Sequence, residues 1–220
     1  MNIYSYPFFE KYSFLYKKTS WAIDIRHLMV LHNLLMNLDF KKVLEIGCHY
    51  GVSSTAFIET LNYKNIEIHF CDKRLTKSIK VIAKQGMLNG NIFLHQEDSL
   101  SFLENQINFD FSFIDGFHIS EQLMSEFELL TAVGIKNILL HDTNTYLIEN
   151  INNSIFFDGP PLIAKRLLSS KNWYCIEDKQ YREKEETDRG LFFATQNAQI
   201  FDMACEIFEY WGKINLTQLI

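Results

Sequence analysis

Short runs of apolar residues recur along the chain, and acidic residues stand at or near the end of each run. The runs are KVLEIG (42–47), IEIHFCD (66–72), NIFLHQ (91–96), FDFSFID (109–115) and NILLHD (137–142). Several are apolar at consecutive rather than alternate positions, which is typical of parallel strands buried on both faces. Stretches with helical spacing lie between them, near 52–62, 76–88, 99–106 and 119–130. The pattern predicts an α/β fold, with a Rossmann-like, doubly wound, mostly parallel sheet and helices on both faces.

The two ends of the chain add elements to this core. Apolar residues at helical spacing between Trp21 and Leu38 predict an amphipathic helix, so we expect residues 1–40 to form a helical extension and 41–220 the main domain. Residues 143–161 are a candidate insertion or lid, and PPLIAKRLLSS, which starts with two prolines, predicts a helix. NWYCIE and GLFFATQ predict two further strands joined by a polar hairpin loop, which gives a seven-stranded sheet, and a closing helix is expected over about 198–210.

Composition narrows the class of protein. The chain has 220 residues, of which 47% are hydrophobic and 22% charged, and its net charge of −6 argues against a nucleic acid or an anionic membrane as the main partner. The four cysteines lack metal-site spacing and are expected to be reduced core thiols. No apolar run approaches the roughly 20 residues of a membrane span. We therefore expect a cytoplasmic protein. A homo-oligomer stays open, because the aromatic N-terminal segment could pack against a second subunit.

Acidic side chains gather where the predicted strands end. In an open parallel sheet, ligands bind beyond the carboxyl ends of the strands, so the residues at those ends are the candidates for a site. They are Glu45 with Ile46 and Gly47, Asp72, Glu97 with Asp98, Asp115, and His141 with Asp142. Helix capping explains one or two acids after strands. Five strands that all deliver an acid to one edge indicate a binding site.

The first strand end continues as EIGCHYGVSS. Gly47 and Gly51 bracket a tight strand-to-helix turn where a ligand can approach bare backbone. The spacing is G-x-x-x-G, unlike the G-x-G-x-x-G of a dinucleotide site. Glu45 would disfavour a diphosphate there but would tolerate a cationic ligand. Asp72 ends the next strand, where an acid can accept hydrogen bonds from both hydroxyls of a ribose.

The segment VLEIGCHYGVSS resembles motif I of the class I S-adenosylmethionine (SAM)-dependent methyltransferases, and the resemblance extends over about 41–196. It is closest to the small-molecule O-methyltransferases of the catechol, macrocin and mycinamicin type. The resemblance implies that Gly47 and Gly51 line the methionine part of SAM, with Glu45 and Ser53 of the same segment in the cofactor site. It also implies that Asp72 binds the ribose.

Two further segments carry the resemblance. EDS (97–99) is similar to the segment that contacts adenine, which implies that Asp98 reaches the exocyclic amine and that Ser99 lies beside it. DGFH (115–118) resembles the D-G-x-H segment of the metal-dependent branch, and HD (141–142) resembles its second acidic pair. The order of these segments along the chain strengthens the likeness.

By this resemblance, Asp115, His141 and Asp142 hold a divalent metal, magnesium or manganese, and Asp115 also lies in the cofactor site. His118 occupies the branch's base position, where it would take the proton of an acceptor hydroxyl while the oxygen attacks the sulfonium methyl. Imidazole is a poor magnesium ligand. His141, where relatives often have a carboxylate, could therefore be a second base or a buried hydrogen-bonded histidine instead.

The resulting hypothesis is an enzyme that moves the methyl group of SAM to a hydroxyl of a small molecule, with a divalent metal and a histidine base. Two alternatives stay open: a metal-independent methyltransferase, and a cofactor-binding protein without catalysis in a biosynthetic complex. Ser120 and Glu126 stand where the branch commonly has an aromatic residue and an aspartate, which leaves the acceptor undefined. Four other histidines, His27, His32, His69 and His95, stand in no motif of this kind. We expect them to be ordinary surface or core residues.

Overall fold

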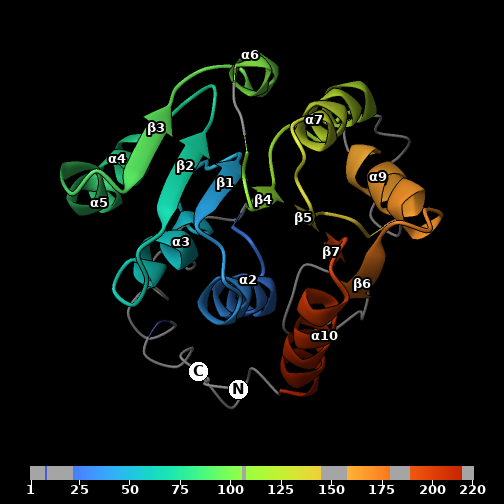
Figure 1. The fold of residues 1–220 in the computed structure, drawn as a ribbon. Helices are drawn as coiled ribbons and strands as arrows, with labels where there is room; N and C mark the ends of the chain where they lie inside the picture. Colours follow the sequence, from blue (N-terminus) through green and yellow to red (C-terminus); the bar gives the residue numbers. More distant parts are fainter. Residues whose placement is uncertain (1–7, 9–21, 106–107, 145–157, 179–188, 215–220) are drawn as a thin grey trace.

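A seven-stranded sheet runs through the computed structural model, which describes residues 8, 22–105, 108–144, 158–178 and 189–214 (Figure 1). The strand order is β3-β2-β1-β4-β5-β7-β6. The strands are β1 (Lys42–Ile46), β2 (Glu67–Cys71), β3 (Ile92–His95), β4 (Phe111–Ile114), β5 (Asn137–His141), β6 (Tyr174–Asp178) and β7 (Leu191–Thr195). β1 to β5 pair in parallel, whereas β7 runs antiparallel to both β5 and β6. The predicted Rossmann-like, mostly parallel sheet is confirmed.

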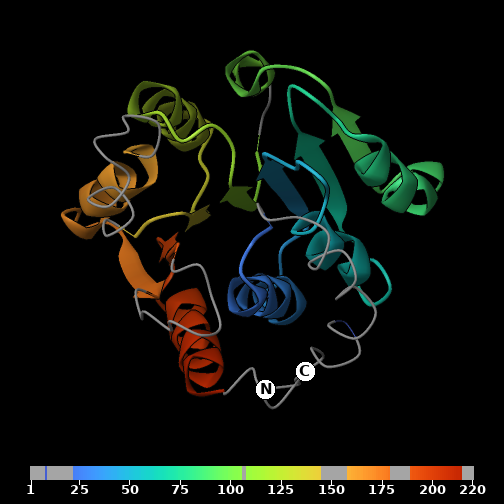
Figure 2. The ribbon, with the colours of Figure 1, turned by 180° about the vertical axis from the view of Figure 1, so that it is seen from behind.

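Helices cover both faces of this sheet, as Figures 1 and 2 show from opposite sides. The described helices are α2 (Ile25–Asn37), α3 (Ser54–Thr60), α4 (Lys77–Ile82), α5 (Lys84–Leu88), α6 (Ser99–Glu104), α7 (Ser120–Ala132), α9 (Gly159–Leu168) and α10 (Ala198–Lys213). On one face, α2 packs against α3 and α10. On the other, α7 packs against α6 and α9. The sheet is therefore the middle of three layers.

Consecutive apolar residues in the strands explain why both faces are covered. Successive side chains of a strand point to opposite faces. In β1, Val43 belongs to the core under α2 and α3, whereas its neighbour Leu44 belongs to the core under α6 and α7. Leu139 and Leu140 of β5 divide in the same way. Each such strand buries apolar area on both faces, which stabilises the layered fold by roughly 25 cal/mol per Å² of area removed from water.

The N-terminal helix belongs to the same core as the sheet. Leu31, Leu34 and Leu35 of α2 are fully buried, and their cluster includes residues of β1, β4 and α10. The predicted helix over 76–88 is instead two short helices, α4 and α5, separated at Ala83. Most of the lid candidate (145–157) and of the hairpin loop (179–188) lies outside the described residues. No helix among the described residues is long and apolar enough to cross a membrane.

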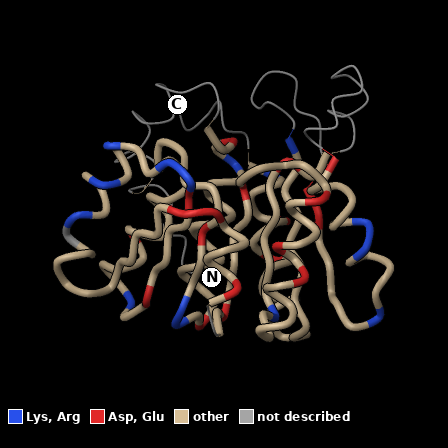
Figure 3. The backbone as a smooth tube through the Cα atoms, turned by 90° about the horizontal axis from the view of Figure 1, so that it is seen from above, with Lys and Arg blue, Asp and Glu red and all other residues tan. Residues whose placement is uncertain are grey.

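Strand order reverses between β1 and β4, because the chain continues from β1 to β2 on one side and returns through β4 on the other. In such sheets, the crevice at this switch point is the usual ligand site. The backbone is tightly joined there: Gly47 N–H donates to the Cys71 carbonyl at 2.9 Å, and Asp115 N–H donates to the Ile46 carbonyl at 2.9 Å. In Figure 3, many of the acidic positions gather in the middle of the view, whereas basic positions lie largely toward its two sides.

Gly47 is where a side chain would be least tolerated. Its φ is +88°, and a Cβ would lie 2.2 Å from the Asp115 carbonyl oxygen. Gly134 has nearly the same φ, +87°, but a Cβ there would meet nothing within 4 Å. The two glycines thus separate the cost of an unfavourable φ from the cost of a collision between strand ends.

We predict that Gly134→Ala lowers the free energy of unfolding by only about 1–2 kcal/mol, the cost of a left-handed alanine. Gly47→Ala should lower it by a further ~1–3 kcal/mol or more, because β1 and β4 must move apart. Urea denaturation of both variants measures this difference. Equal losses for the two variants would contradict the close approach of Gly47 to Asp115.

Candidate active site

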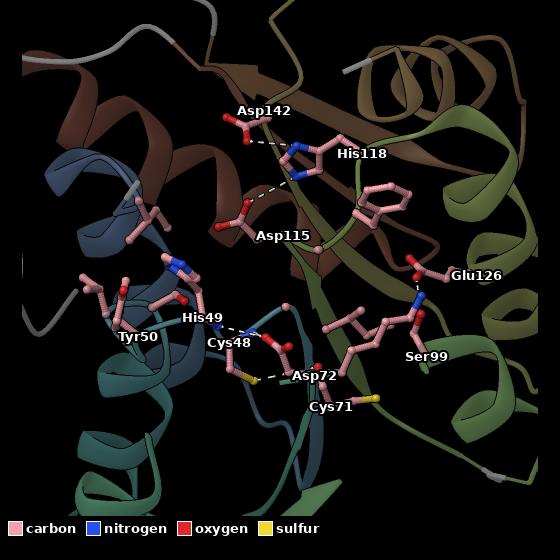
Figure 4. A pocket seen from close by; sticks show the side chains of 18 of the residues that line it. Cys48, His49, Tyr50, Cys71, Asp72, Ser99, Asp115, His118, Glu126 and Asp142 are labelled. Carbon is pink, nitrogen blue, oxygen red and sulfur yellow. Dashed lines mark hydrogen bonds and ion pairs between the residues drawn. The ribbon is translucent and has the colours of Figure 1, made fainter. Parts of the chain in front are cut away.

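A cavity of about 650 Å³ lies at the switch point, beyond the ends of β1, β2, β4 and β5 (Figure 4). Many of the predicted site residues line it, namely Gly47, Ser53, Asp72, Ser99, Asp115, His118 and Asp142. Four others stand behind its wall or beside it, namely Glu45, Gly51, Asp98 and His141. Four strand ends therefore converge on one hollow, as the pattern of strand-end acids predicted.

Asp72 supports the glycine turn from below. Its Oδ2 accepts hydrogen bonds from the backbone N–H groups of Cys48 at 2.9 Å and His49 at 3.0 Å, and its Oδ1 accepts from Arg74 N–H at 2.8 Å. Each carboxylate oxygen has two lone pairs, so these contacts leave Asp72 able to accept further hydrogen bonds from the cavity. The side chain is half-buried and lines the hollow.

Glu45 has a different position from the one that its motif suggested. It is fully buried, and it accepts hydrogen bonds from the hydroxyls of Ser53 and, at 2.6 Å, Ser54. Burial raises the pKa of Glu45 to about 8 against the opposing effect of these two hydroxyls, so the carboxyl group is largely neutral at pH 7. Glu45 therefore fixes the start of α3 beneath the turn, and it supplies little negative charge for a cationic ligand.

The end of the cavity near β3 is formed by α6 and α7. Ser99 donates a hydrogen bond to Glu126, and Gln122 Nε2 donates to Ser99 Oγ at 2.9 Å and to Glu126 Oε1 at 3.1 Å. All three line the cavity. Burial raises the pKa of Glu126. Asp98 instead caps α6 through Leu100 N–H.

Asp98 is also engaged on its other side. Its Oδ2 lies 2.7 Å from Lys73 Nζ, and this ion pair lowers the pKa of Asp98. Asp98 is not among the residues that line the cavity, whereas Ser99 and Lys73 are.

Asp115, His118 and Asp142 form an acidic cluster at the opposite end of the cavity. His118 Nε2 lies 3.5 Å from Asp115 Oδ1, and His118 Nδ1 lies 3.4 Å from Asp142 Oδ2. One ligand-type atom from each of the three residues lies within 4.8 Å of the others, a spacing at which they could share a metal ion. Asp142 has a φ of +57°, which an aspartate tolerates better than most residues and which turns its side chain back over the end of β5.

Charge in this cluster is shared between the carboxylates and two histidines. Burial would raise the pKa of Asp115, but the neighbouring His141 and His118 hold it well below its usual range. Burial would also lower the pKa of His118, but Asp115 and Asp142 raise it. The pKa of His141 is likewise raised well above its usual value by the same two carboxylates. In this arrangement the protonated form of both imidazoles is more favoured than it is for a histidine in water.

His141 is not open to the cavity. Its ring is fully buried, with Nδ1 3.2 Å from Asp115 Oδ1 and 3.4 Å from Asp142 Oδ1. Its Nε2 lies 3.1 Å from Nδ1 of His27, which is also buried. Because both ring nitrogens face protein groups, the structure gives no path by which His141 could take a proton from an acceptor as a second base. The alternative of a buried, hydrogen-bonded histidine fits its surroundings.

Sequence reasoning did not find several residues of this region. Arg189 lines the cavity with its Nε 3.9 Å from Asp142 Oδ1, and it follows a loop that carried no motif. Tyr50 and Phe117 are about half exposed and also line the hollow. His27 was expected merely in the core or at the surface, yet it contacts His141. The spacing Asp24-x-x-His27 at the start of a helix is the only signal the sequence offered for this contact.

Comparisons with known proteins agree with the fold and the site. The strand order and the cavity at the switch point define the class I methyltransferase fold. Residues 44–143, from β1 to just beyond β5, match the family model described as a methyltransferase domain. This match, over somewhat less than half of the chain, agrees with the predicted class of enzyme. No curated protein matches the sequence.

Solved structures share the fold at low identity. An O-methyltransferase from Bacillus cereus in complex with SAH (S-adenosylhomocysteine, the demethylated product of SAM) is 16% identical with a TM-score of 0.65, over 86% of this chain and 90% of that one. TomG from Streptomyces achromogenes, an O-methyltransferase in complex with SAM, is 14% identical with a TM-score of 0.62, over 86% of both chains. The SAH-bound methyltransferase PaMTH1 from Podospora anserina is 13% identical with a TM-score of 0.63, over 86% of both chains.

The neutral carboxyl of Glu45 generates a prediction about pH. Between the ordinary pKa of 4.5 and the raised value of about 8, the folded protein binds one proton more than the unfolded chain at this residue. Its contribution to stability is thus present below pH 4.5 and is lost as the pH rises toward 8. Glu45→Gln keeps an acceptor for one serine hydroxyl, offers an N–H donor to the other, and does not titrate.

We expect the stability of the wild type relative to Glu45→Gln to fall with pH across this range, by up to about 1.4 kcal/mol per pH unit. Urea unfolding of the two proteins at several pH values measures it. A difference independent of pH would mean that Glu45 is ionised in the folded protein.

Proposed function

We propose that the protein transfers the methyl group of SAM to a hydroxyl of a small molecule, with a divalent cation on Asp115 and Asp142 and with His118 as the base. One observation carries this proposal: the glycine turn with Asp72 and the Asp115–His118–Asp142 cluster line the same cavity from opposite ends. The similar structures include O-methyltransferases with SAM or SAH bound, which supports an oxygen acceptor and this cofactor.

The proposed cofactor site uses the turn and the end near β3. The tight backbone at Gly47 leaves room for the methionine part of SAM, and Asp72 can accept from the ribose hydroxyls while it holds the turn. Ser99, Gln122 and Glu126 offer polar groups where the base would lie. Phe117, half-exposed at the rim, supplies an aromatic face for stacking. Asp98 would need to leave Lys73 to reach the exocyclic amine, so we assign this recognition to Ser99 and its neighbours.

The proposed metal site uses the two carboxylates. Asp115 and Asp142 supply oxygen ligands, which suit magnesium or manganese. His141, expected as a third ligand, faces both carboxylates from behind, so we propose that its Nδ1–H orients them instead. When bound, SAM supplies an electrophilic methyl group, and a divalent cation lowers the pKa of an acceptor hydroxyl.

His118 then has a defined task. Its ring lies within 3.5 Å of each carboxylate, and these ion pairs raise its pKa, which disfavours a base. Once the carboxylates are engaged by a cation, His118 loses the partners that keep it protonated. The neutral imidazole can accept the proton of an acceptor hydroxyl as its oxygen attacks the methyl carbon. Arg189, beside Asp142, can balance negative charge on the acceptor side.

A metal-independent methyltransferase is the second candidate. The observation that favours it is that His118 already bridges both carboxylates with its two ring nitrogens. In that case Asp115 and Asp142 would only orient the histidine, and the acceptor would lose its proton without help from a cation. The raised pKa of His118 makes this route slower at neutral pH.

Asp72 tests the cofactor site. Asp72→Ala should weaken the binding of SAH by at least about tenfold, because charge-assisted hydrogen bonds to the ribose are each worth roughly 1.5–3 kcal/mol. Calorimetric titration with SAH measures the affinity. The same change also removes hydrogen bonds to the turn, so it needs a control that suffers a similar structural loss.

Asp110→Ala is that control. Asp110 Oδ2 accepts from the backbone N–H groups of Lys41 at 2.7 Å and Lys42 at 2.9 Å, at the opposite end of β1. We expect Asp110→Ala to lose stability but to bind SAH as the wild type does. Equal SAH affinity in Asp72→Ala and Asp110→Ala would remove Asp72 from the cofactor site.

Asp142 and His118 test the chemistry. Asp142→Asn should lose a bound magnesium ion but keep its affinity for SAH, whereas His118→Gln should keep both. Turnover of His118→Gln should fall by about 10²–10⁴-fold, the usual contribution of a positioned base. Magnesium titration, calorimetry with SAH, and an assay on a panel of phenols and deoxysugar glycosides give the three readouts.

Two results would change the assignment. Turnover that is unaffected by a chelator, together with no magnesium binding to the wild type, would favour the metal-independent route. Wild-type turnover by His118→Gln would remove His118 as the base.

A further inference from the structure

A second group of metal-ligand side chains lies behind the cavity wall, apart from the proposed site. Asp24, His27 and His141 come from three separate places, namely the residue before α2, the first turn of α2 and the end of β5. All three are buried, and one ligand-type atom from each lies within 4.8 Å of the others. Neither the methyltransferase fold nor the proposed reaction requires such a group at this place.

The distances within this group suit a tetrahedral ion better than hydrogen bonds alone. His27 Nδ1 lies 3.1 Å from His141 Nε2 and 3.7 Å from Asp24 Oδ2. Ligands held at roughly 2.0–2.1 Å from zinc in a tetrahedron are about 3.3–3.4 Å apart, which falls between these two distances. The contact of His27 with Asp24 is too long for a hydrogen bond. The hydrogen bond between His27 and His141 therefore explains the shorter of these two distances but not the longer one.

The position of Asp24 is an independent observation. Asp24 is the N-cap residue of α2, a position where an aspartate normally accepts a hydrogen bond from the first turn. Its side chain makes no such cap hydrogen bond. The carboxylate is instead close to His27, one turn along the helix. By sequence, Asp24 is thus a helix-capping residue. In the structure its carboxylate lies beside His27, in the buried group of metal-ligand side chains.

Outer contacts complete the arrangement. His27 Nε2, the nitrogen that faces away from the group, lies 4.0 Å from Asp178 Oδ2, and His141 Nδ1 lies 3.2 Å from Asp115 Oδ1. Histidine ligands usually donate their second N–H to a carboxylate, as His141 can do to Asp115, whereas the distance from His27 to Asp178 is too long for a hydrogen bond.

We propose that Asp24 Oδ2, His27 Nδ1 and His141 Nε2 bind a zinc ion, which takes the place of the proton between the two imidazoles and joins α2 to β5 beneath the active site. Two imidazole nitrogens and one carboxylate suit zinc, whereas magnesium prefers oxygen ligands. The site differs in chemistry from the oxygen-rich pair Asp115 and Asp142. It fixes the ring of His141, so that Nδ1–H is directed to the carboxylates of the cavity. This site does not depend on the proposed methyl acceptor.

Metal content of the purified full chain tests the proposal. The protein is offered zinc with magnesium in excess, desalted, and analysed by mass spectrometry for metal per chain. The wild type should retain one zinc per chain, and His27→Gln and Asp24→Asn should lose it.

Two control variants separate this site from its surroundings. Asp142→Asn, in the cavity, should retain zinc while it loses magnesium. His32→Gln changes another buried histidine of α2, which stacks on Phe8 at a ring distance of 4.2 Å and lies outside the group, and it should also retain zinc. Loss of zinc from Asp142→Asn together with its retention by His27→Gln would overturn the proposal, because the ion would then lie in the cavity.

Cobalt in the wild type gives a test that needs no variant to fold. Cobalt bound by Asp24, His27 and His141 should show the strong visible absorption of a four-coordinate ion, and an excess of zinc should abolish it. The weak spectrum of a six-coordinate ion, or no retained zinc in the wild type, would overturn the proposal.

Discussion

Asp115 and Asp142 end adjacent parallel strands, so the pairing of β4 with β5 brings two carboxylates together at the edge of a buried sheet. Carboxylates removed from water in this way must be balanced by positive charge or else take up protons. His118 supplies one balancing group from the cavity side, and His141 supplies another from inside the protein. The raised pKa values of both histidines and the lowered pKa of Asp115 express the same constraint.

The opposite wall of the cavity avoids the same problem by neutralising its acid. Glu45 is the residue before the last in β1 and is fully buried, where an unpaired charge would be costly. Two serine hydroxyls bind it, and its pKa rises to about 8. The turn above it can then pass close to the end of β4, where Gly47 meets the backbone of Asp115. On one side of the cavity, hydrogen bonds to a neutral Glu45 stabilise the structure. On the other side, ion pairs of Asp115 and Asp142 with histidines do so.

The sequence carried enough information to predict the sheet and one edge of the site. Runs such as FDFSFID are apolar on both faces of a strand, so they indicate a covered parallel sheet whatever the distant packing is. Strand order then places Asp72, Asp115 and Asp142 at one edge. The surroundings of each acid could not be predicted in the same way. Asp98 caps a helix and pairs with Lys73, and Glu45 lies behind the wall of the cavity. Neither position could be predicted, because local sequence does not show which side of a turn a side chain faces.

Contacts between distant segments were the least predictable. His27 and His141 are 114 positions apart, and they meet only because α2 packs on the face of the sheet where β5 buries its last residue. The helical spacing of 21–38 predicted the helix but gave no information about its rotation or its neighbour. Gly86 of α5 likewise lies against Ile92 of β3, so closely that a Cβ would come within 2.3 Å of it, and helical spacing gave no information about this contact either.

His118, within the acidic cluster, and His141, behind it, contact the same two carboxylates, Asp115 and Asp142. Their surroundings nevertheless allow them different chemistry. His118 follows β4 in a loop and has a ring that lines the cavity, so its proton can be exchanged with a bound molecule. His141 is the last residue of β5 and is shielded on every side, so its second nitrogen can only meet another protein group or an ion held by one. A carboxylate at position 141 would have added a third negative charge to this edge. Histidine there supplies a donor to the two acids and a second nitrogen to α2, and it thereby connects the cavity to the helical layer behind it.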